Sequence, residues 1–405
     1  MKNKNKSNIK IAVIGGGPAG KYCAIELAKN KNFTIDLYEK NKIGGTCLNY
    51  GCTYITGLRE MADIINNLNL IKNNNNNEKI NLEDIISFEQ LQNKVNEIQN
   101  KIRTVLTREI KQHNNINLIY EEYKEEYKNT KNYDFVVWAT GKKYSNKLGN
   151  IKGLIHLDIV NLKELPKKIL IIGGGTVAME YASLFSNYGS EVIVYVRSNF
   201  LKQIEDKDVR DYILKFIQFK IINNEEELNK LINSNEYTII LAVGGKPTIE
   251  TDEYLKVKGK TNEYACGDCV VGKGGTTPVS RMEGEIVAQN IYNQINNLPF
   301  IKPEYENIPN TIRLDLNISY VGKQTNEYKL IPNSVGKGDF FRVSNNIGIN
   351  KIFYEHGKVV GAISMSPSME IIPYFAQYLK GINVYRDFVE IHPSTDIFYK
   401  ILRNR

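Results

Sequence analysis

The sequence predicts an α/β protein built on two Rossmann-like dinucleotide-binding domains. Two observations predict this fold: a β-branched run leads into a glycine-rich turn and a helical pattern near residue 15, and the same succession occurs again near residue 173. A third observation suggests what the domains serve, because Cys47 and Cys52 follow soon after the first turn. Two nucleotide sites and a cysteine pair together favour electron transfer between cofactors.

Length and composition exclude several other classes of protein. A chain of 405 residues is long enough for two or three domains, and five cysteines do not form a secreted disulfide framework. No apolar run reaches the roughly 18 residues of a membrane span, and Met1–Lys10 lacks the apolar stretch of a secretory signal. The net charge of +8 comes from scattered lysines. We therefore expect a cytoplasmic protein with no membrane or nucleic-acid partner.

The first turn follows the strand Lys10–Ile14 with the spacing G-x-G-x-x-G. Its glycines let the backbone approach a pyrophosphate, and the helix that continues through Leu27 directs its positive N-terminal end to the same point. The next strand, Thr34–Tyr38, ends at Glu39, a carboxylate suited to a ribose with a free 2′-hydroxyl. FAD fits this turn, which consists of Gly15, Gly17, Pro18, Ala19 and Gly20.

The second turn follows the strand Lys168–Ile172. After the next strand, Glu191–Val196, Arg197 holds the position that Glu39 holds in the first module. A cation at that position suits the 2′-phosphate of NADPH, and Lys202 adds to the charge, whereas the alternative is an ordinary surface arginine. We expect NADPH here, with NADH as the alternative, at a turn formed by Gly173, Gly175, Thr176, Val177 and Ala178.

The cysteine pair lies in a glycine-rich segment. Four residues separate Cys47 from Cys52, enough to close a small loop, and Gly44, Gly45 and Gly51 remove side chains that would keep another ring system away. A pair of buried structural cysteines is the alternative, because free cysteine is among the most buried residue types. The position of the pair after a dinucleotide turn favours a redox-active disulfide beside a flavin.

These motifs resemble the class I pyridine nucleotide-disulfide oxidoreductases, the group of dihydrolipoamide dehydrogenase, glutathione reductase and mercuric reductase. The resemblance spans nearly the whole chain. It includes further motifs, namely A-T-G at 139–141, A-V-G-G-K-P at 242–247, Y-A-C-G-D at 264–268, T-P-V at 277–279, G-A at 361–362 and H-P at 392–393.

The resemblance implies a domain order and an assembly. The FAD domain would comprise residues 1–143 and 263–300, with the NAD(P)H domain inserted at 144–262. A C-terminal α+β interface domain, 305–405, would form a homodimer in which His392 completes the active site of the other subunit. A surface histidine is the alternative interpretation of His392.

The resemblance also implies the roles of individual residues. Cys52 would lie next to the flavin and Cys47 would exchange with the substrate, while His392 would protonate the leaving thiol. Cys52 opens a predicted helix running to Met61, whose dipole is expected to lower the pKa of Cys52. The cofactor-binding set, besides the two turns and their charged residues, comprises Lys40, Gly45, Thr46, Ala139, Thr140, Gly141, Glu180, Gly244, Gly267, Asp268, Thr277, Pro278 and Val279.

Two catalytic positions depart from the family pattern. Thr56 stands where the family has a lysine that pairs with the glutamate matched by Glu180, so Glu180 is expected to have a raised pKa or another donor. Ile397 stands where the family has the glutamate that orients the histidine, and Asp396, one residue earlier, is the candidate substitute.

Two further departures concern the nucleotide domains. The 45 residues from Arg197 to Ala242 predict a trimmed NAD(P)H domain with a reduced β excursion. Cys266 and Cys269 form a C-x-x-C that we interpret as small-residue packing around Asp268, because no second ligand pair accompanies it.

The sequence thus predicts an FAD-dependent NAD(P)H:disulfide oxidoreductase of the dihydrolipoamide dehydrogenase type, acting on a small disulfide or dithiol. A glutathione-type reductase of low-molecular-weight disulfides is the runner-up, and Arg197 favours it. Mercuric reductase is disfavoured because no cysteine follows Cys269. An NAD(P)H oxidase or quinone reductase with accessory cysteines, and a flavoprotein redox sensor, are the alternatives from other classes.

Overall fold

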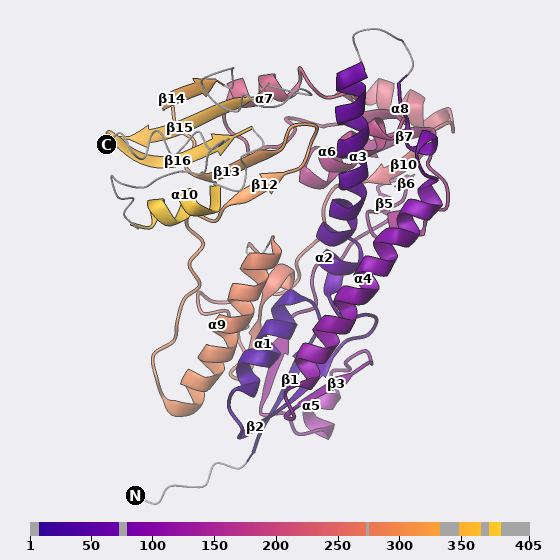
Figure 1. Ribbon diagram of the computed structural model, residues 1–405. Coiled ribbons are helices and arrows are strands. Elements are labelled where there is room, and N and C mark those ends of the chain that lie inside the picture. The colour runs from indigo at the N-terminus through magenta and orange to yellow at the C-terminus, as the bar shows by residue number, and fades with distance from the viewer. Residues whose placement is uncertain (1–7, 73–78, 273–274, 333–347, 366–371, 382–405) are drawn as a thin grey trace, which may run out of the picture.

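The computed structural model describes residues 8–72, 79–272, 275–332, 348–365 and 372–381, and Figure 1 shows their arrangement. Three main sheets organise these residues: a five-stranded sheet near the N-terminus, a four-stranded sheet in the middle of the chain and a five-stranded sheet toward the C-terminus. The predicted fold class is confirmed, because the first two sheets are parallel and carry Rossmann-like connections.

The first sheet has the strand order β11-β4-β1-β2-β3. Its strands are apolar β-branched runs with both faces covered, so Ile11, Ala12 and Val13 have no exposed surface. The helices α1 and α9 pack closely because Gly284 of α9 has no side chain: a Cβ there would lie 2.3 Å from the Ala19 carbonyl oxygen. The bounds are β1 Ile9–Ile14, α1 Pro18–Ala28, β2 Phe33–Tyr38, β3 Ile116–Ile119, β4 Phe135–Trp138, β11 Glu263–Ala265 and α9 Thr277–Asn296.

A long helical hairpin separates β2 from β3. It consists of α2 (Gly45–Asn49), α3 (Cys52–Lys72), a short 3₁₀ turn η1 (Leu82–Asp84) and α4 (Phe88–Lys111). Figure 1 shows α3 and α4 side by side, with α3 passing close to α6 of the second sheet. The hairpin therefore carries the cysteine segment from the first nucleotide domain toward the second.

An aromatic cluster covers the first sheet between β3 and β4. Tyr38, Tyr123 and Tyr133 surround one another with ring centroids 5.2 to 6.5 Å apart, next to the short helix α5 (Tyr127–Thr130). Trp138, at the end of β4, packs edge-on against Tyr123 and donates its indole N–H to Glu263 over 2.9 Å. These aromatic rings cover one face of β1, β2 and β4 with few residues.

The second sheet has the order β10-β7-β8-β9 and is parallel throughout. The predicted trimming is seen here, because the chain between Arg197 and Ala242 forms two short helices and the three-residue strand β9 before β10. The bounds are β5 Lys147–Leu148, β6 Ile151–Lys152, η2 Ile159–Asn161, β7 Lys168–Ile172, α6 Thr176–Asn187, β8 Glu191–Tyr195, α7 Lys207–Ile213, β9 Lys220–Ile222, α8 Glu225–Asn233 and β10 Thr238–Leu241.

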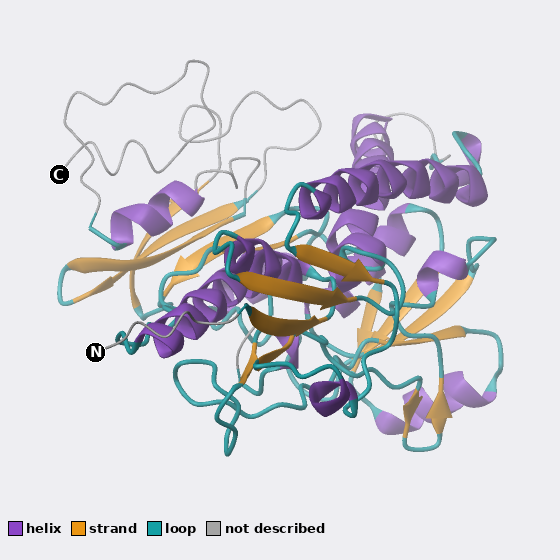
Figure 2. Cartoon of the chain, turned by 90° about the horizontal axis from the view of Figure 1, so that it is seen from below, coloured by secondary structure: helices purple, strands orange, loops and turns teal. Residues whose placement is uncertain are grey.

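The third sheet is antiparallel, with the order β12-β13-β16-β15-β14. One helix, α10 (Ile372–Leu379), lies against one face of it, as Figure 2 shows. The strands are β12 Asn310–Ile312, β13 Ile318–Gly322, β14 Glu327–Pro332, β15 Ile349–Glu355 and β16 Lys358–Ser364, so Gly361 and Ala362 belong to this sheet.

The chain leaves the first sheet after β4 and returns to it with β11. Where it leaves and returns, Lys143 and Lys246 exchange two backbone hydrogen bonds of 3.0 and 2.8 Å. The residue boundaries at 143, 262, 300 and 305 stay predictions.

Candidate active site

The cysteine segment packs directly on the first glycine turn. The Gly44 N–H donates to the Gly16 carbonyl over 2.9 Å, and a Cβ on Gly45 would lie 2.8 Å from the Cα of Gly17. Gly44 and Gly45 both have positive φ, at 108° and 60°, which glycine adopts without strain. The absence of side chains thus brings Cys47, in α2, and Cys52, at the start of α3, beside the predicted FAD turn.

The two cysteines are free thiols that share a hydrogen bond. The bond from the Cys52 thiol lowers the pKa of Cys47 to about 6, with help from the Thr277 hydroxyl and the backbone N–H groups of Cys52 and Thr53. The same thiol–thiol bond raises the pKa of Cys52. The reduced pair therefore shares one proton and carries one negative charge at neutral pH.

This result corrects one prediction about α3. The helix does begin at Cys52, but the N–H groups of its first turn stabilise the Cys47 thiolate, and the pKa of Cys52 moves in the direction opposite to the one expected. Backbone amides stabilise the sulfur that lies in front of a helix, and Cys47 occupies that place.

Glu180, in α6, is partly buried and accepts a hydrogen bond from the Arg313 N–H over 2.9 Å. Burial, with a smaller contribution from the neighbouring Cys52, raises the pKa of Glu180 to about 7. Because Thr56 replaces the family's lysine, we expected Glu180 to have a raised pKa or another hydrogen-bond donor. Glu180 has both. Thr56 itself is exposed on α3.

The buried cation of α3 is Arg59, which sequence reasoning did not single out. Arg59 is 1% exposed and contacts Asp63 at 2.7 Å, Asp315 at 3.2 Å and the Ser183 hydroxyl at 2.5 Å. Asp315 also accepts from Ser183 over 2.7 Å and from Asn187 over 2.6 Å. The signal in the sequence is the spacing, because Arg59 lies two helical turns after Cys52 on the same side of α3.

The first turn has the shape that a pyrophosphate group needs. A Cβ on Gly15 would lie 2.3 Å from the Ala139 carbonyl oxygen, and one on Gly20 would lie 1.9 Å from the Gly15 carbonyl oxygen. Glu39 is 9% exposed and accepts 2.8 Å hydrogen bonds from the Gly16 and Asn41 N–H groups, which hold its carboxylate beside the turn. These residues fit FAD, with the diphosphate at the start of α1 and the ribose at Glu39.

The second turn repeats this geometry at the start of α6. A Cβ on Gly173 would lie 2.3 Å from the Ala242 carbonyl oxygen, whereas Gly175 and Gly244 face open space. Thr176 and Val177 begin α6, and Ala178 is buried at the position of the third glycine. Arg197 and Lys202 are exposed, and neither forms an ion pair within the described residues. These residues fit a dinucleotide.

The residues predicted to hold the rest of the flavin gather around the start of α9. Asp268 accepts from the Gly275 N–H over 2.8 Å and lies 3.6 Å from Lys142. Thr277 begins α9 together with Pro278 and Val279, and its hydroxyl contacts both cysteine sulfurs, a role that the sequence did not suggest. Gly267 has φ +76°, and a Cβ there would lie 2.8 Å from the Cβ of Ala19.

Other predicted residues take simple positions. Cys266 and Cys269 are buried, burial raises the pKa of both, and the Cys269 thiol donates to the Trp138 carbonyl, which agrees with packing. The described residues contain no cluster of three or more metal-ligating side chains. Lys40 is exposed and pairs with Glu122 at 3.2 Å. His392 and Asp396 lie outside the described residues.

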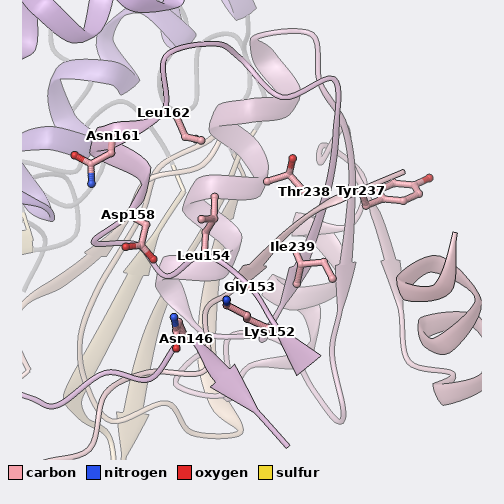
Figure 3. A pocket seen from close by; sticks show the side chains of 10 residues that line it. All are labelled: Asn146, Lys152, Gly153, Leu154, Asp158, Asn161, Leu162, Tyr237, Thr238 and Ile239. Atoms are coloured by element: carbon pink, nitrogen blue, oxygen red, sulfur yellow. The ribbon is translucent and has the colours of Figure 1, made fainter. Parts of the chain in front are cut away.

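A groove at the edge of the second sheet lies apart from these residues. Figure 3 shows Asn146, Asp158 and Asn161 on one side of it and Tyr237 and Thr238 on the other. None of its lining residues belongs to the predicted redox or cofactor sets, so the groove is not part of the candidate active site.

Comparison with known proteins defines the class. Residues 9–223 match the family model of pyridine nucleotide-disulphide oxidoreductases. The chain is 58% identical over 397 residues to an uncharacterized protein of Methanocaldococcus jannaschii, with 98% of each chain covered. It is 24% identical to the dihydrolipoyl dehydrogenase of Bacillus subtilis, with 95% of each chain covered.

The fold has a matching solved structure. The HOCl-induced flavoprotein disulfide reductase RclA from Escherichia coli superposes with a TM-score of 0.76 at 20% identity, covering 98% of this chain and 99% of that one. The chain therefore belongs to the pyridine nucleotide-disulphide oxidoreductase family, as its motifs suggested. Among the described residues, no helix is both long enough and apolar enough to cross a membrane.

The shared proton of the cysteine pair gives a pH prediction. Alkylation of Cys47 by iodoacetamide in the reduced protein should follow a titration near pH 6, with the rate about tenfold lower at pH 5 than at pH 8 because only the thiolate reacts. Peptide mass spectrometry after timed quenching measures the rate at Cys47. In Cys52→Ala, which lacks the donating thiol, the midpoint should rise. A midpoint near 8.5 in the parent protein, about that of free cysteine, would contradict the shared proton.

The raised pKa of Glu180 gives a second prediction. Above pH 7 the carboxylate is ionised without a paired cation, so Thr56→Lys should raise the flavin midpoint at pH 8 by roughly 20 to 40 mV, corresponding to about 1 to 2 kcal/mol. At pH 6 Glu180 is protonated, and the two proteins should differ little. Anaerobic redox titration at both pH values measures the midpoints. Glu180→Gln should abolish the pH difference, and coinciding midpoints at pH 8 would refute the effect of Glu180.

Proposed function

We propose that this protein is an FAD-dependent NAD(P)H:disulfide oxidoreductase of the dihydrolipoamide dehydrogenase type. The observation that carries the proposal is the packing of Gly45 on Gly17, which places a cysteine pair with a shared proton directly beside a turn that fits FAD. Bound FAD would supply the transfer of electrons from the nicotinamide to the disulfide. The family assignment supports the same conclusion.

The residues around the pair suggest how the chain handles protons and thiols. Cys47, with its pKa of about 6, is the sulfur that would attack a substrate disulfide and release one of its thiols, and Cys52 would face the flavin. The hydroxyl of Thr277 contacts both sulfurs and holds them in place. Glu180 would keep the charge near Cys52 low by holding a proton around neutral pH.

The nucleotide and the substrate are proposed at a finer level. Two exposed cations, Arg197 and Lys202, follow β8 without an acid at the strand end, which favours NADPH over NADH. The second candidate is a reductase of low-molecular-weight disulfides of the glutathione type, because an enzyme that uses NADPH is suited to reducing its substrate. A small disulfide or dithiol in the cytoplasm fits both. The next experiment tests the alternative that the protein is an oxidase or quinone reductase with accessory cysteines.

Substitution of the cysteines should separate the roles of the two sulfurs. Cys52→Ser should keep bound FAD but lose disulfide reduction and the long-wavelength absorption that a Cys52 thiolate beside the flavin gives on anaerobic addition of NADPH, since bound FAD would favour the form of the pair in which Cys47 holds the shared proton. Cys47→Ser should lose disulfide reduction but keep that absorption. Stopped-flow absorbance and a panel of disulfides, including lipoamide and glutathione disulfide, measure both. Persisting disulfide turnover in Cys52→Ser would show that the cysteines are accessory.

We further propose a homodimer in which His392 of one subunit serves the cysteine pair of the other, with Asp396 orienting it. Subunits carrying Cys52→Ser and subunits carrying His392→Gln should each be inactive alone. A random mixture, refolded together, should recover about a quarter of the wild-type activity, because half of the dimers are mixed and one of their two sites is intact. Sedimentation velocity establishes the dimer. No recovery from a proven mixed dimer would place the histidine elsewhere.

A further inference from the structure

Residues 197–206, here called the β8–α7 segment, carry the two cations of the second nucleotide site. Arg197 and Lys202 are both exposed on it, and long flexible side chains on a mobile loop would lose much of their binding energy on being ordered. The conformation of this segment therefore matters for the choice of nucleotide. The structure shows that it is held from two sides.

The first side is the glycine turn itself. The Leu201 N–H donates to the Gly174 carbonyl over 2.7 Å, and the Gln203 amide donates to the Thr176 hydroxyl over 2.8 Å. Because Thr176 accepts this hydrogen bond, its own proton is free to be donated to a phosphate oxygen. Leu201 is fully buried with φ +44°, a conformation that a leucine keeps only where its surroundings impose it.

The second side is the C-terminal sheet. Gln324, two residues after β13, accepts from the N–H groups of Glu205 and Asp206 over 2.8 and 3.0 Å and donates to the Gln203 carbonyl over 2.9 Å. One amide side chain thus holds three residues of the β8–α7 segment. Gln203, whose carbonyl it binds, in turn donates its side-chain amide to the Thr176 hydroxyl.

A buried lysine strengthens the same connection. Lys351 of β15 is 1% exposed, lies 2.8 Å from Asp206 and 2.7 Å from Asp208, and sits 3.8 Å from the centre of the Tyr328 ring. Asp206 also caps α7 by accepting from the Val209 N–H over 2.9 Å. The far end of the segment is therefore fixed by a charge pair removed from water, which screening weakens little.

We propose that Gln324 and Lys351 are positioning residues for nucleotide selection: from the C-terminal sheet they fix the β8–α7 segment so that Arg197 and Lys202 are ordered for a 2′-phosphate before the nucleotide binds. The inference rests on the proposed NADPH site. It adds that the preference for a 2′-phosphate depends on two residues of the C-terminal sheet region, one of which is linked to the nucleotide turn through Gln203.

The test compares two ligands that differ only in the 2′-phosphate. Adenosine 2′,5′-bisphosphate and 5′-AMP are titrated calorimetrically into the FAD-loaded full-length protein. Gln324→Leu should weaken the bisphosphate about tenfold, the loss of ordering for one or two long side chains, and weaken 5′-AMP less than about threefold. Gln324→Glu keeps both acceptor bonds but loses the donation to the Gln203 carbonyl, so its affinity for the bisphosphate should lie between those of the parent and Gln324→Leu. Lys351→Met should reproduce the effect of Gln324→Leu.

The controls separate this inference from the proposed function. Arg197→Ala should weaken the bisphosphate alone, and if it does not, the second site is not of the NADPH type. If Arg197→Ala has its effect while Gln324→Leu and Lys351→Met do not, the NADPH site stands and the positioning role is wrong. An equal loss for both ligands in Gln324→Leu also overturns the positioning role, because it shows general damage. Lys323→Met, which removes an exposed ion pair with Glu355 on the same sheet, should change neither affinity.

Discussion

The candidate active site depends on the ion pairs and hydrogen bonds of the buried Arg59 guanidinium. It joins α3, which begins with Cys52, to Ser183 on α6 and to Asp315 in the C-terminal part of the chain. A charge with 1% exposure is stable only when it is paired and hydrogen-bonded, so these three elements are fixed relative to one another. The loop that contains Asp315 also contains Arg313, whose N–H reaches Glu180. The surroundings of Cys52 are thus set by contacts from three parts of the chain.

This arrangement changes where positive charge lies near the redox pair. The Arg59 cation sits two turns along α3 and pairs with Asp63 and Asp315, so the hydrogen-bond donor to Glu180 is the neutral backbone N–H of Arg313. The amides of the first turn of α3 and the Thr277 hydroxyl supply the stabilisation of the thiolate instead. Backbone amides do not ionise in the pH range in which proteins are folded, and no side chain has to be ordered for them to act. They therefore stabilise the thiolate over a wide range of pH.

Much of the fold could be predicted from the sequence because glycine turns after β-branched strands leave few alternatives. The strand at 168–172 was located correctly, and the strands at 10–14, 34–38 and 191–196 were within one residue. The site was predicted less completely. The pKa order of Cys47 and Cys52 depends on where the amides of α3 point, and the roles of Arg59, Arg313 and Gln324 depend on contacts between residues more than a hundred positions apart. No local pattern carries such contacts.

The aromatic cluster of the first sheet has a practical consequence. Trp138 is the only tryptophan of the chain, and it ends β4 directly before the A-T-G turn at 139–141. Its indole is held by Glu263, and its backbone carbonyl accepts from both Cys266 and Cys269. The tryptophan fluorescence of the protein therefore comes from one fixed ring whose strand ends in the first nucleotide domain. When excited at the long-wavelength edge, where tyrosine does not absorb, its emission reports on that domain without signal from the 25 tyrosines of the chain.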